Sequence, residues 1–152
     1  AFASEGEWER YWTEDDALFR GETGVAGASR VELIWKYSGG EPTWPPNTPY
    51  WHHASGWWTQ WDRLREKFSH AKPPAALQEF TDYTRREQAE KLAFAVRAKK
   101  ARFPRCGGFL IWMGHDAFPC LANTSIVEFD HALKPAALAV AEVFKAAPGS
   151  LS

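Results

Sequence analysis

The stretch CGGFLIWMG, residues 106–114, decides the fold class that the chain can adopt. Its apolar side chains follow one another without interruption, and glycines bound the run on both sides. This pattern is typical of a strand that is buried on both faces, as in a parallel sheet. The stretch therefore predicts an α/β protein built around parallel strands.

Helical patterns lie on both sides of this strand in the sequence. Residues 75–103 carry a stripe at helical period, apolar at most of its positions, formed by Leu77, Phe80, Thr84, Gln88, Leu92, Ala95 and Val96. Two prolines precede this helix and Pro104 stops it, because proline cannot continue the hydrogen bonding of a helix. Residues 134–147 predict a final helix, with Pro135 well placed in its first turn.

The remaining sequence predicts shorter elements. They are a strand at 17–20, a turn at Gly21–Gly24, a helix at 28–38 capped by Ser29, a long loop at 41–56, a helix at 57–68 and a short extended piece at 125–129. Residues 5–16 are acidic and aromatic and show no clear period. The order is strand and then helix, twice, with a large insertion between the two units.

Two strands cannot by themselves complete a parallel sheet. Such a sheet is covered on both faces, and each unpaired edge exposes backbone N–H and C=O groups. We therefore expect an incomplete domain, the end of a repeating βα architecture whose earlier strands lie elsewhere. The isolated chain is expected to fold poorly or to self-associate.

Composition limits the classes of function. The chain has 152 residues, enough for one domain, of which 45% are hydrophobic and 24% charged. A net charge of −1 and scattered Lys and Arg residues argue against a nucleic-acid partner. No apolar run reaches the roughly 18 to 20 residues that span a bilayer, so no membrane partner is predicted. Cys106 and Cys120 make no metal framework, and their pairing as a disulfide stays open.

The start of the chain carries no targeting signal. It shows neither a signal-peptide pattern nor an initiator Met. We expect that it begins after processing or is a piece of a longer protein, and its cell compartment is not predicted.

Tryptophan is unusually frequent, with nine residues in the chain. Several of them lie in loop-like sequence rich in Pro and Gly. Flat indole rings cover the C–H faces of sugars well, and the indole N–H can donate to a hydroxyl. The tryptophans therefore fit either carbohydrate binding or packing among themselves, and the sequence leaves both interpretations open.

Two stretches resemble the end of the catalytic barrel in glycoside hydrolase family 2, in its β-mannosidase branch. The stretch "GGFLIWMGHDAFP…TSIVEFDHALKPAALAV" carries the first match through Trp112, Asp116, Phe118-Pro119, Ser125, Asp130 and Lys134. The stretch "DDALFRGETGVAGASRVELI" is similar to the family's seventh-strand region, where Glu22 falls on the catalytic nucleophile and Gly24 on the following glycine. A third stretch, "TPYWHHASG" at 48–56, resembles the loop that precedes a His-Gln pair in the β-mannosidases.

The resemblance implies that residues 1–152 are the C-terminal part of a glycosidase (β/α)8 barrel, its last two βα units. Active residues of such barrels sit at the carboxyl ends of strands. In the retaining mechanism one carboxylate attacks the sugar while a second protonates the leaving group, about 5 to 5.5 Å away. Glu22 is the expected nucleophile. The family's acid/base follows an asparagine, but Asn47 and Asn123 each precede threonine, so activity of the chain alone is not expected.

The resemblance also implies a sugar pocket. Its expected contributors are Trp112, Asp116, His115, Trp51, His52 and His53. Four of these residues also have a structural interpretation: Trp112 as core at the barrel mouth, Asp116 as a loop hydrogen-bond partner, and His52 and His53 as solvated loop residues. No ligand spacing supports a metal site, and no cofactor is expected.

The sequence departs from the family pattern near the sugar. Arg20-Gly21 and Thr23 flank Glu22 where the family has other residues, and Met113 and His115 replace Gln and Asn. The glycan is therefore left open. The alternative function, from another class, is a non-catalytic carbohydrate-binding module that uses the Trp-rich loops.

Overall fold

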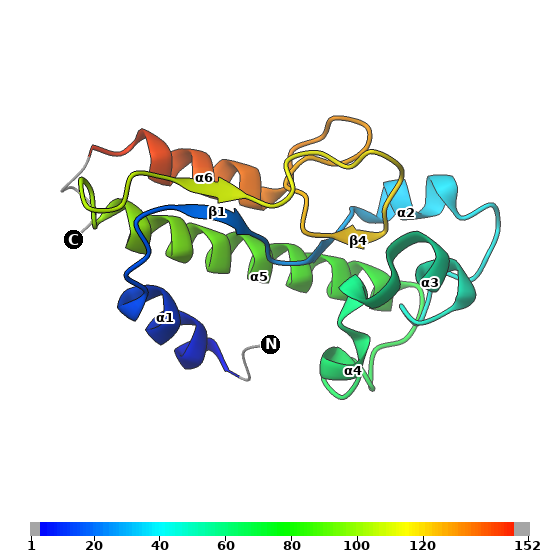
Figure 1. The fold of residues 1–152 in the computed structure, drawn as a ribbon. Helices are drawn as coiled ribbons and strands as arrows, with labels where there is room; N and C mark the ends of the chain where they lie inside the picture. The colour runs from blue at the N-terminus through cyan, green and yellow to red at the C-terminus, as the bar shows by residue number, and fades with distance from the viewer. Residues whose placement is uncertain (1–3, 148–152) are drawn as a thin grey trace.

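The structure is a computed structural model that describes residues 4–147 of the chain. The described residues form helices and short strands in the order α1 Glu5–Glu14, β1 Arg20–Thr23, β2 Gly27–Ala28, α2 Val31–Tyr37, α3 Pro49–Ser55, a 3-10 turn Gly56–Thr59, α4 Trp61–Leu64, α5 Ala75–Lys100, β3 Phe109–Ile111, β4 Ala122–Asn123 and α6 Pro135–Lys145. The chain is thus mixed α/β (Figure 1).

Strands β1 and β3 form a parallel pair, as the sequence predicts. Arg20 is opposite Phe109, and Thr23 is opposite Ile111. The backbone N–H of Arg20 donates to Gly108 O at 3.0 Å at one end of the pair. Parallel neighbours need a crossover connection, and the chain supplies one that contains α5.

One face of this strand pair is covered by helices. Helix α5 contacts α1 on one side and α6 on the other, and it runs behind the strands in Figure 1. Trp12 from α1 meets the ring of Phe109 with 5.6 Å between centroids, and Val140 from α6 joins the same core. This apolar burial holds the strands against the helical layer.

The other face of the strand pair is open within residues 4–147. Leu110 points away from the helices and is 54% exposed, between the core residue Phe109 and the partly buried Ile111. The predicted burial of this strand on both faces is therefore wrong for the described residues. An apolar side chain of this size on a strand face is typical of a surface that another element covers.

The insertion between α2 and α5 builds a second core around Phe80. Rings from Trp44, Trp51, Trp61 and Phe68 contact Phe80 edge-on, with centroids 5.6 to 6.2 Å apart. Such edge-to-face contacts are favourable beyond the area that they bury. The tryptophans of the insertion therefore pack among themselves.

Packing inside the fold explains why the chain contains so many tryptophans. Among the tryptophans whose side chains are described, only Trp35 and Trp112 are exposed, at 54% and 47%. The side chain of Trp57 lies outside the described set. Trp112 is therefore the exposed indole that the fold places next to the strand pair.

The long helices and the short helix α2 lie where the sequence predicts them, whereas several other short elements do not. Helix α5 and helix α6 lie where periodicity places them, and Pro135 opens α6. The predicted helix at 57–68 is wrong: it reduces to a 3-10 turn and one turn of α4. The predicted loop at 41–56 is wrong over Pro49–Ser55, which is α3.

Three further differences concern α1, the start of α2 and residues 125–129. Residues 5–16 contain α1, which buries only Trp8 and Trp12, one turn apart, so that its apolar period is too short to recognise. Ser29 does not cap α2, because its hydroxyl donates to Cys120 O at 2.7 Å. The extended piece predicted at 125–129 forms no strand, and Val127 makes only isolated bridges there.

None of the helices in residues 4–147 combines the length and the apolar character that a membrane crossing requires. Cys106 and Cys120 are both free and buried.

A largely buried carboxylate ties the entry of β1 to the helical layer. Asp15 follows α1 and pairs with Arg20 of β1 and with Lys99 of α5. Hydrogen bonding to Arg20 lowers the pKa of Asp15 to about 2, assisted by Lys99 and against the opposing effect of burial. The charged form of Asp15 is therefore favoured by the fold.

We predict that Asp15→Asn lowers stability by about 2 kcal/mol at neutral pH. The pKa of Asp15 in the folded chain lies below its ordinary value of 3.8, so this contribution is present above about pH 4 and is lost as pH falls toward 2. Urea unfolding of both forms between pH 2 and 7 measures the difference. Asp16→Asn, at the exposed neighbouring position, is the control and should change little. An Asp15 effect that does not diminish toward pH 2 would contradict the assignment.

Candidate active site

The candidate site lies where β1 and β3 end. Because the strands are parallel, their carboxyl ends meet at one edge. There the backbone N–H of Trp112 donates to Thr23 O at 2.9 Å. Thr23 is buried and Ile111 packs on the helical layer, so their neighbours Glu22 and Trp112 project to the open face. The fold thus places the predicted nucleophile and one of the predicted sugar-pocket residues at the same edge of the strand pair.

Glu22 lies inside β1 and not in a turn after it. The predicted strand at 17–20 and the turn at Gly21–Gly24 are wrong, because backbone pairing with β3 continues to Thr23. The Glu22 side chain is exposed and makes no hydrogen bond or ion pair with another described residue. Its carboxylate is therefore free to interact with a ligand on the open face.

Gly24 permits the close contact between the two strand ends. A Cβ at this position would lie 2.3 Å from Trp112 O and 2.8 Å from the Thr124 Cβ. Only hydrogen fits there, so the chain leaving β1 passes directly against the chain leaving β3. The peptide bond between Trp112 and Met113 is cis.

The loops after the two strands are joined by a second, smaller pairing. Gly27 of β2 is opposite Asn123 of β4, and Ala28 is opposite Ala122, in antiparallel register. Ser29 N–H donates to Leu121 O at 2.8 Å and continues this ladder. Strands of two residues carry no periodic signal, which explains why the sequence did not predict them.

Two fully buried polar side chains lie between the loop that follows β1 and the loop that follows β3. Gln88 of α5 donates from Nε2 to Val25 O at 2.8 Å and to Ser125 O at 3.0 Å. Lys134, just before α6, donates from Nζ to Gly27 O at 3.0 Å and to Ser125 Oγ at 3.2 Å. Each side chain therefore holds both loops at once.

A buried carboxylate, Glu128, connects the loop after β3 to the start of α2 and to α5. Glu128 is fully buried, accepts the backbone N–H of Arg30 at 2.8 Å and pairs with the guanidinium groups of Arg30 and Arg85. Arg30 also pairs with Asp130, and this contact lowers the pKa of Asp130. Asp130 is thus a partner of Arg30, while Glu128 was not singled out in the sequence because a lone Glu gives no local signal of burial.

Asp116 lies behind the site. Its side chain is fully buried and accepts from Asn123 Nδ2 at 3.2 Å, and its second oxygen has no hydrogen-bond partner among the described residues. Burial raises the pKa of the Cys120 thiol to about 11, and the neighbouring Asp116 charge contributes. The contacts that the structure gives Asp116 fix the loop after β3.

The expected histidines and Trp51 are dispersed. His115 is exposed and stacks on His131, with 4.9 Å between ring centroids. Trp51 is fully buried and its indole N–H donates to Thr43 O at 2.9 Å, so it offers no face to a sugar. His52 and His53 are exposed on α3. In residues 4–147 no cluster of three side chains suited to metal binding occurs.

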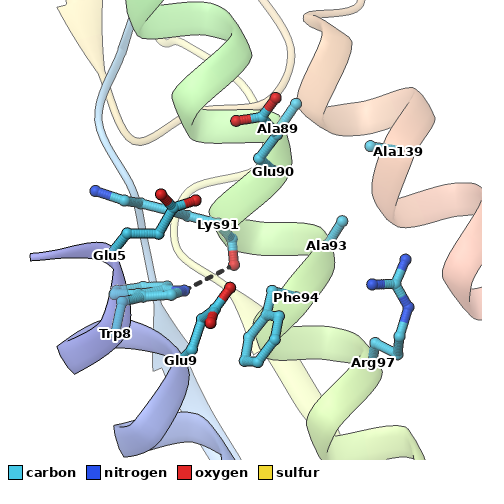
Figure 2. A pocket seen from close by; sticks show the side chains of 10 residues that line it. All are labelled: Glu5, Trp8, Glu9, Ala89, Glu90, Lys91, Ala93, Phe94, Arg97 and Ala139. Carbon is cyan, nitrogen blue, oxygen red and sulfur yellow. Dashed lines mark hydrogen bonds between the residues drawn. The ribbon is translucent and has the colours of Figure 1, made fainter. Parts of the chain in front are cut away.

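One cleft of the structure reaches the end of β1, and another lies between the helices. A cleft of about 740 Å³ extends from Gly24 to His52, Trp61 and Arg63 of the insertion. A second cleft, of about 370 Å³, lies on the helical side, where α1 faces α5 and α6 (Figure 2). There the Trp8 indole N–H donates to Lys91 O at 3.1 Å, above a floor of small residues. The second cleft contains none of the residues predicted for the site.

Comparison with known proteins gives a likeness of fold. No protein family and no curated protein matches the chain. Among solved structures the chain is similar to a β-D-mannosidase from Dictyoglomus thermophilum, with a TM-score of 0.75 and 20% sequence identity. The match covers 90% of this chain and 17% of that one, so the chain spans about one-sixth of the neighbour's length.

We predict that Gly24→Ala disturbs the site while Gly21→Ala does not. A Cβ at Gly24 meets backbone and a β-branched side chain, which cannot move away as a flexible side chain can, whereas a Cβ at Gly21 meets nothing within 4 Å. Thermal unfolding should show a loss of at least about 1 kcal/mol for Gly24→Ala and almost none for Gly21→Ala. Equal effects of the two substitutions would refute the close contact between the strand ends.

Proposed function

We propose that this chain is the closing part of the (β/α)8 barrel of a retaining, β-mannosidase-like glycoside hydrolase of family 2. The observation that carries the proposal is the placement of Glu22 and Trp112 on one open face, at the carboxyl ends of adjacent parallel strands. Barrel enzymes place their active residues at this edge. The fold likeness to a β-D-mannosidase over 90% of the chain supports the same assignment.

The open face of the strand pair supports an incomplete barrel. Helices cover one side of β1 and β3, while Leu110 projects from the other side. In a closed barrel each strand has two neighbours, and its inward side chains pack in layers. The proposed partner of residues 1–152 is therefore the remainder of the barrel, which supplies the missing strands and the acid/base carboxylate.

Glu22 acts as the nucleophile in the proposed mechanism. One oxygen of its carboxylate attacks the anomeric carbon, and the bond from that carbon to the leaving oxygen breaks as the acid/base carboxyl donates its proton. Water then attacks the glycosyl–enzyme ester, gives its proton to the same acid/base and releases Glu22. The sequence of steps needs two carboxylates and water. The exposed Glu22 side chain, without a partner among the described residues, suits an attacking anion.

Trp112 provides the platform for the sugar. Its indole is half exposed beside Glu22, and an aromatic face of this kind covers the C–H groups of a pyranose ring. His115 lies three residues further along the same loop and is placed to contact hydroxyl groups, with Asp116 holding the loop from behind. His52 lines the cleft beside Gly24 and is proposed to contact a substrate group that extends into it, whereas His53 does not line this cleft.

The alternative of a non-catalytic carbohydrate-binding module has less support. It depends on exposed tryptophans in the insertion, and Trp44, Trp51 and Trp61 pack around Phe80 instead.

We predict that Glu22→Gln, in the protein that contains the complete barrel, lowers kcat on p-nitrophenyl β-D-mannoside by several orders of magnitude. The amide keeps the size of the side chain but cannot form the ester intermediate. Stability should change by no more than about 0.5 kcal/mol, because the side chain is exposed. Steady-state kinetics and thermal unfolding give the two values.

Glu41→Gln is the matched control, since Glu41 is an exposed glutamate of the insertion. It should retain wild-type turnover. Wild-type turnover in Glu22→Gln would remove Glu22 as the nucleophile.

A further inference from the structure

We propose that Lys134 is a positioning residue for the site, because its ammonium group holds the loop that follows β1 against the loop that follows β3. The inference rests on the proposed function, since it assigns a role in the same reaction. Lys134 touches neither Glu22 nor Trp112 in the contacts of the structure and would act through the backbone that carries them.

The geometry of Lys134 suits this role. Its side chain is completely buried, and Nζ donates to Gly27 O at 3.0 Å and to Ser125 Oγ at 3.2 Å. Gly27 lies in β2, in the segment that follows β1, and Ser125 lies just after β4, in the segment that follows β3. An ammonium group has three donors and can serve two acceptors at once, which no apolar side chain can do.

The surroundings of the ammonium group are charged on several sides. Asp116 and Glu128 favour its protonated form, whereas burial and the neighbouring Arg85 oppose it; the Cys120 thiol lies nearby. Burial is the largest effect and lowers the pKa of Lys134 to about 8. Burial of an ammonium group is unfavourable unless its partners are well placed. An apolar side chain would fill the same space without this desolvation penalty, so packing alone does not explain the lysine.

The hydrogen bond from Lys134 fixes Gly27, and a short segment with little conformational freedom connects Gly27 to Glu22. Gly24 lies against Trp112 O with room only for a hydrogen, so the chain between β1 and Gly27 has little freedom as long as both ends are fixed. Release of Gly27 would let the end of β1 move relative to Trp112. A displacement of about 1 Å between reacting groups can cost about a hundredfold in rate.

The chain offers a matched control for a buried lysine. Lys99 of α5 is 1% exposed and pairs with Asp15, at the entry of β1 and not at its carboxyl end. Each of the variants Lys99→Met and Lys134→Met removes one buried ammonium group. Lys99→Met loses the ion pair with Asp15, and Lys134→Met loses the hydrogen bonds to Gly27 and Ser125. Both variants should lose stability, but only Lys134→Met changes the strand ends.

The test is made in the protein that contains the complete barrel, with p-nitrophenyl β-D-mannoside as substrate. At a temperature where both variants are folded, Lys134→Met should lower kcat by about tenfold to a hundredfold with a smaller change in KM. Lys99→Met should keep kcat within about twofold. Equal kcat for the two variants, at similar losses in melting temperature, would overturn the positioning role.

A milder variant keeps the proposal testable if Lys134→Met does not fold. Ser125→Ala removes one of the two acceptors and leaves the bond to Gly27, and it should lower kcat by about fivefold, the effect of one net hydrogen bond. Unchanged kcat in this variant would count against the proposal.

Hydrogen exchange separates this inference from the proposed function. Lys134→Met, or Ser125→Ala in its place, should speed amide exchange at residues 24–28 and 122–125, whereas Lys99→Met should speed it near 15–20. This readout needs no substrate. Wild-type protein without glycosidase activity would remove the proposed function, and an exchange pattern that is the same in the lysine variants would remove the hold of Lys134 on the loops.

Discussion

The joining of two strand-end loops is the constraint on which the rest of the structure depends. The parallel pair of β1 and β3 is only a few residues long, and the loops that leave it fix its alignment at the carboxyl ends. Beyond Thr23 the chain has no room at Gly24, and it then pairs with the loop after β3 through β2 and β4. The position of Glu22 relative to Trp112 is set by this joined pair of loops.

Most of the buried contacts that connect the two loops come from polar side chains, which is unusual for contacts in the interior of a protein. Gln88, Lys134 and Glu128 are fully buried, and each contacts backbone of the loops. Apolar residues would fill the same space at a lower cost of desolvation. Hydrogen bonds, however, fix the distance and direction of a backbone group, and loops without long strands have few other means of alignment. In the proposed enzyme that alignment sets the geometry between nucleophile and sugar platform.

The sequence predicted the long helices and the parallel pairing of the two strands, whereas the roles of Glu22 and Trp112 stay predictions. Helix α5 has many turns of one apolar stripe, so its period is unmistakable, whereas α1 buries two tryptophans and β2 and β4 have two residues each. Glu22 and Trp112 were singled out through their match to a family motif, and the structure places them in and directly after the paired strands β1 and β3. Lys134 was matched only as a family position. Its buried contacts reach Gly27, 107 positions away, and Ser125, 9 positions away, and no local pattern encodes them.

Covalent labelling tests the central claim most directly, that the open face of β1 and β3 carries a nucleophile. A 2-deoxy-2-fluoro-β-mannosyl fluoride slows the second step of a retaining mechanism, so the glycosyl–enzyme ester accumulates. Mass mapping of peptides from the labelled protein with its complete barrel should place the sugar on Glu22, in the peptide that contains β1. Label on a different carboxylate, or inactivation without a covalent sugar, would contradict the account.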